Sequence, residues 1–171
     1  MDYSPIVTGT NLDTRALRAA LGSFATGITV ITTCAPDGQW LGLTVNSFNS
    51  VSLEPPLVLW SLADNSPSLD IIRHCSHYAV NVLADDQMDV SQRFASRVAD
   101  KFAGVDCAEG LGGVPLLPNC CAWFECRNEF QYPGGDHLIL VGHVERFAHQ
   151  QQRAPLLYHG GQYRWLSDRN G

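Results

Sequence analysis

Lysine is almost absent from this chain, and long apolar runs are missing altogether. Lys101 is the only lysine among eleven basic residues, and the formal net charge is −6 at pH 7. An acidic chain without a basic patch is unsuited to nonspecific nucleic-acid binding. No stretch approaches the ~20 apolar residues that cross a bilayer, and the first residues lack the basic start and apolar run of a signal peptide. We therefore expect a bacterial-type cytoplasmic protein, with neither nucleic acid nor membrane as a partner.

Cysteine pairs of the Cys-x-x-Cys type are also absent, although the chain has six cysteines. Structural zinc sites need such short paired spacings. The neighbours Cys120 and Cys121 would form a disulfide only through a strained ring, and adjacent residues of a strand point to opposite faces. His74 and His77 could share a helical face, but no further ligand lies beside them in sequence. We predict buried free thiols and no metal site.

Repeats, linkers and low-complexity segments are missing as well, so the 171 residues fit one domain. Strand signals dominate what is present, and we expect strands at about 28–33, 40–52, 57–62, 77–83, 122–132, 138–148 and 163–166. A turn is expected at 36–38 and a loop at 104–119. Strands and helices do not alternate regularly, which favours a barrel over a doubly wound parallel sheet.

Three short helices are expected between these strands. The first would begin after Asp13 as its N-cap and run to about Phe24, and its apolar side would comprise Leu12, Ala16, Leu17, Ala20, Leu21 and Phe24. The second would start with Ser66 as cap and Pro67 at its first position. The third would span 86–96, and its expected inward residues are Met88, Val90 and Phe94.

The stretch from Leu41 to Leu62 has an unusual composition for a pair of core strands. Its two strand-like runs flank Pro55-Pro56, which suits neighbouring strands joined by a short turn. Uncharged hydrogen-bonding side chains fill the first run, namely Thr44, Asn46, Ser47, Asn49, Ser50 and Ser52. Such groups can hold a polar, planar ligand without the desolvation cost of buried charge. The alternative is a Ser/Thr-rich edge strand that faces water.

The segment Asn65-Ser66-Pro67-Ser68 follows this strand pair and predicts an anion site. A helix start presents unpaired backbone N–H groups and a partial positive charge, which favour phosphate. Lys101 and Arg97 are the nearest cationic residues in sequence, and either could add a charge-assisted hydrogen bond. The alternatives are a plain capped helix and, for Arg97, an ordinary surface charge.

The run from Leu41 to Leu62 resembles the flavin-binding core of the short-chain flavin reductases, which are the reductase partners of two-component flavin monooxygenases. Other segments are similar to further motifs of that family, in the same order: 24–33, Asp37-Gly38, 65–68, Phe94-Ala95, 100–102, 135–137, 141–144 and 155–158. The resemblance covers residues 12–166. It implies one flavin reductase-like domain over 12–166, an N-terminal extension at 1–11 and a C-terminal tail at 167–171.

The resemblance implies a mainly β fold with short helices, the FMN-binding split β-barrel, which forms homodimers. Four tryptophans, at positions 40, 60, 123 and 165, also suggest apolar surface for a dimer to cover. The implied activity is an NAD(P)H:flavin oxidoreductase that passes reduced FMN or FAD to a separate flavin-dependent monooxygenase. FMN and FAD remain open. NADH is slightly favoured over NADPH, because no Arg cluster for a 2′-phosphate is visible.

Candidate site residues follow from the matching positions and from the anion site expected around 65–68, for which Arg97 is a nearby cation. The expected flavin-binding residues are Thr44, Val45, Asn46, Ser47, Ser61, Leu62, Asn65, Ser66, Ser68, Arg97, Lys101 and Phe102. The expected nicotinamide-binding residues are Gly135, Asp136 and His137. Glycines before His137 let a ligand approach the backbone closely. No residue is assigned a proton-transfer role, because hydride passes directly between the two cofactors.

Two other interpretations compete with the reductase. The same barrel could bind flavin without turnover, for storage, electron transfer or redox sensing; His137 behind its glycines favours the enzyme. An oxidase of the pyridoxamine phosphate type would need several basic residues for the substrate phosphate, and one lysine with scattered arginines argues against it.

Overall fold

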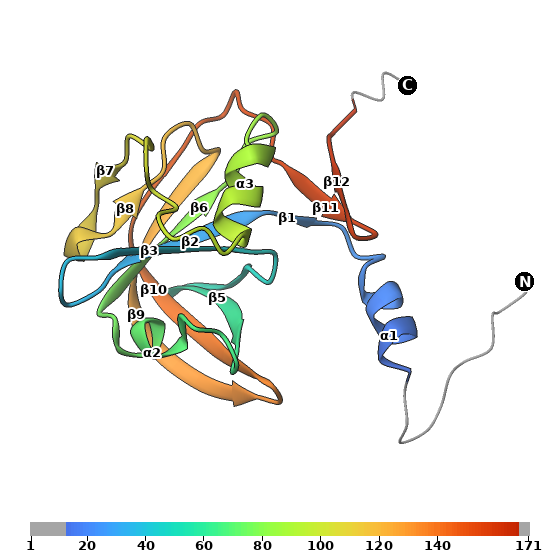
Figure 1. The fold of residues 1–171 in the computed structure, drawn as a ribbon, viewed down its shortest axis with the longest axis horizontal. Helices are drawn as coiled ribbons and strands as arrows, with labels where there is room; N and C mark the ends of the chain where they lie inside the picture. Colours follow the sequence, from blue (N-terminus) through green and yellow to red (C-terminus); the bar gives the residue numbers. More distant parts are fainter. Residues whose placement is uncertain (1–12, 168–171) are drawn as a thin grey trace, which may run out of the picture.

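The computed structural model describes residues 13–167, so Leu12, the expected extension at 1–11 and residues 168–171 of the expected tail lie outside it. The chain is mainly β structure with short helices (Figure 1). The helices are α1 (Thr14–Leu21), α2 (Leu69–His74) and α3 (Met88–Ala95), with a 3-10 turn η1 at Leu111–Gly113. The strands are β1 (Thr26–Gly27), β2 (Thr29–Cys34), β3 (Trp40–Val45), β4 (Asn49–Leu53), β5 (Pro56–Ala63), β6 (His77–Val82), β7 (Ala108–Glu109), β8 (Pro115–Leu116), β9 (Ala122–Gly134), β10 (His137–His149), β11 (Leu157–His159) and β12 (Gln162–Arg164).

Seven strands form one antiparallel sheet in the order β3-β2-β6-β9-β10-β5-β4. Its two edge strands, β3 and β4, follow one another in the chain but do not pair, so the barrel is open along the seam between them. The expected split barrel is confirmed. The pairing of β4 with β5 also confirms the expected hairpin around Pro55-Pro56.

The single strand expected over 40–52 is wrong, because the chain bends at 46–48 and divides it into β3 and β4. Ser47 explains the bend. Its hydroxyl donates to the Ser61 carbonyl at 3.2 Å and accepts from the Ser61 N–H at 3.0 Å. These two bonds turn the chain from β3 toward β5, where β4 then pairs.

Hydrophobic side chains fill two cores that share the central strands. Inside the barrel lie Ile31, Trp60, Tyr78, Val80 and Leu140, all fully buried. A second core lies beneath α3 and comprises Ile28, Val30, Leu83, Phe94, Leu117, Cys120 and Leu156. Both faces of β2 are therefore covered, which explains its uninterrupted run of buried residues.

Helix α1 stands away from the barrel (Figure 1). Asp13 is its N-cap, as expected, and accepts from the Arg15 N–H at 2.9 Å. The helix ends at Leu21, three residues before the expected end. Leu17, Leu21 and Phe24 are exposed, so the predicted apolar side contacts no core of the described chain.

Helices α2 and α3 differ in detail from expectation. In α3, Phe94 is buried and Val90 packs against the second core, but Met88 is exposed because it lies at the first position of the helix. Helix α2 begins at Leu69 rather than Pro67, with Ser68 and not Ser66 at the N-cap. Among these helices none is long and apolar enough to span a membrane, a finding that concerns residues 13–167.

All six cysteines are free thiols, as predicted. Cys75, Cys120, Cys121 and Cys126 are buried, whereas Cys34 and Cys107 are half-buried. Burial raises the pKa of both Cys120 and Cys126 to about 12. These thiols are therefore protonated and unreactive at neutral pH.

Candidate functional site

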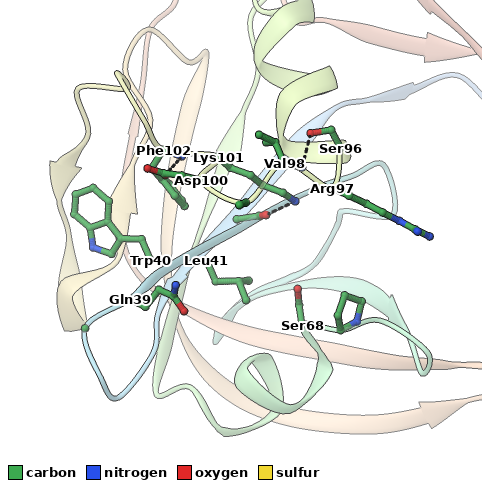
Figure 2. A pocket seen from close by; sticks show the side chains of 14 residues that line it. Gln39, Trp40, Leu41, Ser68, Ser96, Arg97, Val98, Asp100, Lys101 and Phe102 are labelled. Carbon is green, nitrogen blue, oxygen red and sulfur yellow. Dashed lines mark hydrogen bonds between the residues drawn. The ribbon is translucent and has the colours of Figure 1, made fainter.

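A groove of about 910 Å³ crosses the start of β3 (Figure 2). The segment 96–102 forms one wall and the chain before α2 forms another. The lining residues are Gly38, Gln39, Trp40, Leu41, Gly42, Pro67, Ser68, Ser96, Arg97, Val98, Ala99, Asp100, Lys101 and Phe102. Four of the predicted flavin-binding residues meet here: Ser68, Arg97, Lys101 and Phe102.

Lys101 fastens the segment 96–102 to β3. Its Nζ donates to the Gly42 carbonyl at 3.1 Å and to the Phe94 carbonyl at 2.7 Å. Burial lowers the pKa of this ammonium group. Because an ammonium has three N–H donors, one remains for a ligand. Its predicted contact with phosphate stays a prediction.

Arg97 is the more available cation of the groove. Its side chain is exposed, and it makes no side-chain hydrogen bond or ion pair within residues 13–167. A guanidinium offers five N–H donors in a planar fork that matches phosphate oxygens. The position of Arg97 therefore suits an anionic ligand in the groove.

The chain before α2 contributes less to an anion site than the sequence suggests. The helix has only six residues, so its dipole is small. Ser66 accepts from the Ser68 N–H at 3.3 Å. The Ser68 side chain makes no capping bond, so its hydroxyl remains available to a ligand. Any phosphate binding here would depend on side chains more than on the helix end.

A second hollow of about 210 Å³ lies at the other end of β3. It brings together Thr44, Val45 and Asn46 with Ile28, Ser91, Tyr158 and Tyr163. The Thr44 hydroxyl donates to the Ser91 carbonyl at 2.7 Å, which joins β3 to α3. Asn46 is exposed, and its side-chain amide makes no hydrogen bond within residues 13–167. Seven of the predicted flavin-binding residues thus line two hollows along β3, namely Thr44, Val45, Asn46, Ser68, Arg97, Lys101 and Phe102.

Ser47, Ser61 and Leu62 do not reach either hollow. The Ser47 hydroxyl is bonded to the Ser61 backbone, so it shapes the seam of the barrel. Leu62 is buried in the barrel core and could meet a ligand only through its backbone. Roles for these three residues in flavin binding, and for Asn65, stay predictions.

His137 begins β10 and pairs with Ala63 of β5, next to the chain that leads to α2. Its Nδ1 lies 2.7 Å from an Asp136 carboxylate oxygen. This hydrogen bond, together with the charge of the ring, holds the pKa of Asp136 below its ordinary value. The bond orients the half-exposed imidazole and leaves Nε2 for a ligand. Gly135, with φ +73°, completes the tight turn before it.

Sequence reasoning missed Trp40 and Gln39 as groove residues, and Ser91 and Tyr163 as residues of the second hollow. Trp40 was noted only as apolar surface for a dimer. An exposed aromatic at the start of a polar strand was the available signal. The hydroxyls of Ser91 and Tyr163 are hydrogen-bonded at 3.0 Å although the residues are 72 positions apart. No local sequence pattern indicates such a contact.

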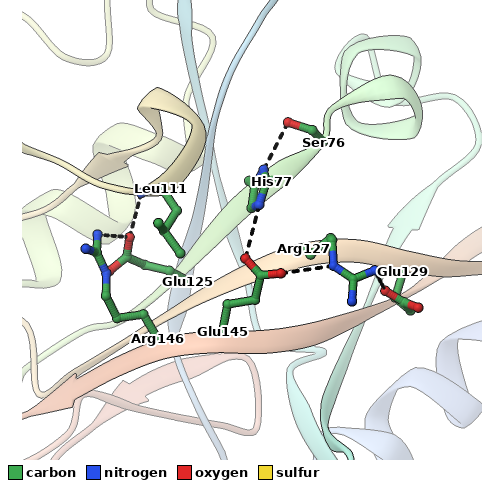
Figure 3. Close-up of polar contacts among 8 residues, drawn as sticks. All are labelled: Ser76, His77, Leu111, Glu125, Arg127, Glu129, Glu145 and Arg146. Atoms are coloured by element: carbon green, nitrogen blue, oxygen red, sulfur yellow. Dashed lines mark hydrogen bonds and ion pairs between the residues drawn. The ribbon is translucent and has the colours of Figure 1, made fainter.

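Figure 3 shows two charged clusters, and none of their residues lines either hollow. Glu125 is only 5% exposed; it accepts from Arg146 Nε at 2.6 Å and from the Leu111 N–H at 2.7 Å. In the other cluster, the Glu145 carboxylate is hydrogen-bonded to the His77 imidazole and accepts from Arg127 Nε. The first cluster fastens the 3-10 turn to the sheet.

The fold and its hollows define a split-barrel protein with a polar seam and a cation-lined groove, suited to an elongated anionic ligand. The chain belongs to the family described as flavin reductase like domain, whose model matches residues 21–167.

Relatives of this family resemble the chain over most of its length. A probable flavin reductase of Rhizobium meliloti (strain 1021) is 45% identical over 141 residues, covering 82% of this chain and 45% of the relative. The FMN reductase (NADH) SmoA of Agrobacterium fabrum is 44% identical over 151 residues, 88% of this chain and 85% of the relative. The chain spans about half the length of several curated relatives that it matches.

A solved structure has the same fold. The NADH:FAD oxidoreductase SgcE6 of Streptomyces globisporus, in complex with NAD and FAD fragments, is 34% identical, with a TM-score of 0.87. The alignment covers 95% of this chain and all of that one.

Proposed function

We propose that the protein is an NAD(P)H:flavin oxidoreductase, which reduces FMN or FAD and supplies the reduced flavin to a separate monooxygenase. The two hollows along β3 carry this proposal, because they place uncharged polar groups at one end and the cationic side chains of Arg97 and Lys101 at the other. That arrangement fits a flavin, which has a polar ring, a polyhydroxyl chain and a phosphate. Several relatives are named as reductase components of monooxygenases, which supports the oxygenase partner.

The residues divide the work of binding. Thr44, Val45 and Asn46 would contact the flavin ring edge and chain, with Ser47, Ser61 and Leu62 shaping the adjacent seam. The phosphate end would be held by Asn65, Ser66, Ser68, Arg97 and Lys101, and Phe102 would line it. Gly135, Asp136 and His137 would orient the nicotinamide. A bound flavin would supply the hydride acceptor, and the residues of this chain would position it and exclude water.

The same proposal includes a homodimer in the cytoplasm, formed by a domain that extends over residues 12–166. Leu17, Leu21 and Phe24 present apolar side chains that the described chain leaves exposed, and burial against a second copy would stabilise them. Six free thiols fit a reducing compartment.

The test is the oxidation of NADH and NADPH by the purified protein with FMN, FAD and riboflavin. We expect a rate well above that of flavin and nicotinamide alone. A rate equal to this background at saturating flavin would remove the enzyme and leave a flavin-binding protein.

A further inference from the structure

The groove over β3 is longer than a phosphate site requires. Its volume of about 910 Å³ lies at the upper end of the range for small-molecule pockets, roughly 300–1,000 Å³. Ser68 and Arg97 lie toward one end and Gln39 and Trp40 toward the other (Figure 2). The polar chemistry thus changes along the groove, from a cationic end to an aromatic one.

Trp40 is held in place at the aromatic end. Its ring meets Phe102 edge to face, with centroids 5.5 Å apart, and Phe102 meets the buried Phe94 at 5.0 Å. Gly42 lies beneath these rings, where a Cβ would come within 2.5 Å of Phe94 and 3.1 Å of Phe102. Trp40 nevertheless remains 37% exposed. A flat base could stack on this open surface with little loss of side-chain freedom.

The charged groups of the groove favour a phosphate-bearing ligand. Arg97 and Lys101 are cationic, and Asp100 is the one anionic side chain of the lining. One oxygen of the Asp100 carboxylate accepts from the Phe102 N–H at 3.0 Å. This oxygen is therefore directed toward the backbone of the segment 96–102. Gln39 has an amide that both donates and accepts, as the edge of adenine requires.

We propose that this groove binds the adenylate half of a dinucleotide, and that the dinucleotide is FAD. The adenine stacks on Trp40, and Arg97 binds the diphosphate. The protein therefore prefers FAD over FMN, since FMN leaves the aromatic end empty. This inference rests on the proposed function.

NADH also carries an adenylate, but the position of the groove favours FAD. Ser68 borders the groove and belongs to the loop that follows β5, where the flavin phosphate is expected. His137, the residue expected at the nicotinamide, does not line the groove.

The test measures dissociation constants of oxidised FAD and FMN, without turnover, for wild type, Trp40→Ala and Trp40→Phe. We expect tighter FAD than FMN binding in wild type. Trp40→Ala should weaken FAD binding by about 10-fold, the scale of stacking one base on an aromatic ring, and change FMN binding less than 2-fold. Trp40→Phe should retain most of the FAD affinity. Trp165→Ala, at an exposed tryptophan outside the groove, is the matched control and should change neither.

Arg97→Gln provides a second variant, because Arg97 is exposed and its loss leaves the core intact. We expect it to weaken FAD binding more than FMN binding. Equal affinity for the two flavins in wild type, or equal losses in Trp40→Ala, would overturn the inference.

A further measurement distinguishes FAD from NADH as the source of the adenylate. With FMN as the flavin, Trp40→Ala should leave the NADH KM unchanged. A raised NADH KM with intact FAD binding would assign the groove to NADH and overturn the proposal. Because flavin binding is measured without turnover, FAD bound through Trp40 with no NADH oxidation would instead be a failure of the proposed reductase.

Discussion

Some polar side chains of the site bond to the protein's own backbone, whereas others keep their hydrogen-bonding groups available to a ligand. The hydroxyls of Ser47 and Thr44 bond the backbone of β5 and α3, respectively. Asn46 and Arg97 make no such bonds within the described residues. Substitutions of the first pair will therefore affect folding and binding together, whereas those of the second pair report on binding.

Asn46→Ala should weaken flavin binding by about 1–2 kcal/mol, the usual cost of leaving a polar group of the ligand unpaired. Circular dichroism should not change, because the Asn46 amide has no partner in the described chain. Asn49→Ala, three residues further on at the exposed edge of β4, is the matched control. Titration of flavin fluorescence measures both, and wild-type affinity in Asn46→Ala would place the flavin elsewhere.

His137→Ala should raise the nicotinamide KM or slow flavin reduction, and should leave flavin affinity nearly intact. The imidazole lies at the tip of β10, outside both hollows. It positions the donor rather than transferring a proton, so turnover should persist. Stopped-flow reduction of the flavin-bound variant is the measurement. Equal damage to both ligands, together with lower stability, would show that the His137–Asp136 bond only closes the turn.

At the scale of elements, buried polar side chains attach the segment 104–119 to the sheet. Asn81 accepts from the Leu117 N–H at 2.9 Å, and Glu125 accepts from the Leu111 N–H. Burial alone would raise the pKa of Glu125. The hydrogen bonds from Arg146 and from the Leu111 N–H, together with the charge of Arg146, outweigh burial and lower this pKa. This carboxylate therefore stabilises the fold in its charged form.

Glu125→Gln should lower the free energy of unfolding by about 2 kcal/mol at pH 7, the scale of hydrogen bonds to a charged group. Because the pKa of Glu125 is lower in the folded than in the unfolded protein, its charged form stabilises the fold at pH values above the ordinary pKa of 4.5. This stabilisation is lost as the pH falls through the folded-state pKa. Denaturant unfolding at pH 7 and pH 3 measures the difference. The gap between variant and wild type should shrink at pH 3; a gap independent of pH would assign the effect to packing. Glu54→Gln, at an exposed position that makes no side-chain hydrogen bond or ion pair within residues 13–167, is the control.

The residue patterns predicted the strands and a barrel, and the family resemblance implied that the barrel is split, but neither predicted where the strands break. Local β propensity and turn residues determine β2, β5, β6 and the β9–β10 hairpin, so their positions follow from pattern. The bend at 46–48 depends on Ser47 reaching Ser61, fourteen residues away, and no local signal reports it. Trp40 was overlooked for a related reason, since Phe102, whose ring it meets edge to face, is distant in sequence.

At the scale of the whole molecule, apolar side chains remain uncovered in a chain that buries two cores. Trp60, one of the four tryptophans that suggested a dimer surface, lies fully inside the barrel and plays no part in it. The exposed residues of α1 and Phe24 take its place as the expected contact. An eight-residue helix such as α1, which buries no side chain against the barrel, is not expected to be stable without a further contact.

The double variant Leu17→Glu/Leu21→Glu should convert the expected homodimer into a monomer, because it places two charges in the apolar contact. Light scattering at micromolar concentration measures the mass. Arg15→Glu, on the opposite side of the same helix, adds negative charge without touching that contact and should remain dimeric. A wild-type protein that is monomeric at this concentration would contradict the expectation directly.

The only lysine of the chain holds the wall of the groove to β3 through two backbone carbonyls. Apart from the N-terminal amino group, an amine-reactive reagent has one target in this sequence, and the two hydrogen bonds of Lys101 should slow its reaction while the segment 96–102 lies against β3. The rate of acylation of Lys101 at a fixed pH should therefore rise when the segment 96–102 lifts from the barrel. A ligand that fills the groove should slow that rate, which makes one residue an internal reporter of occupancy without any added label.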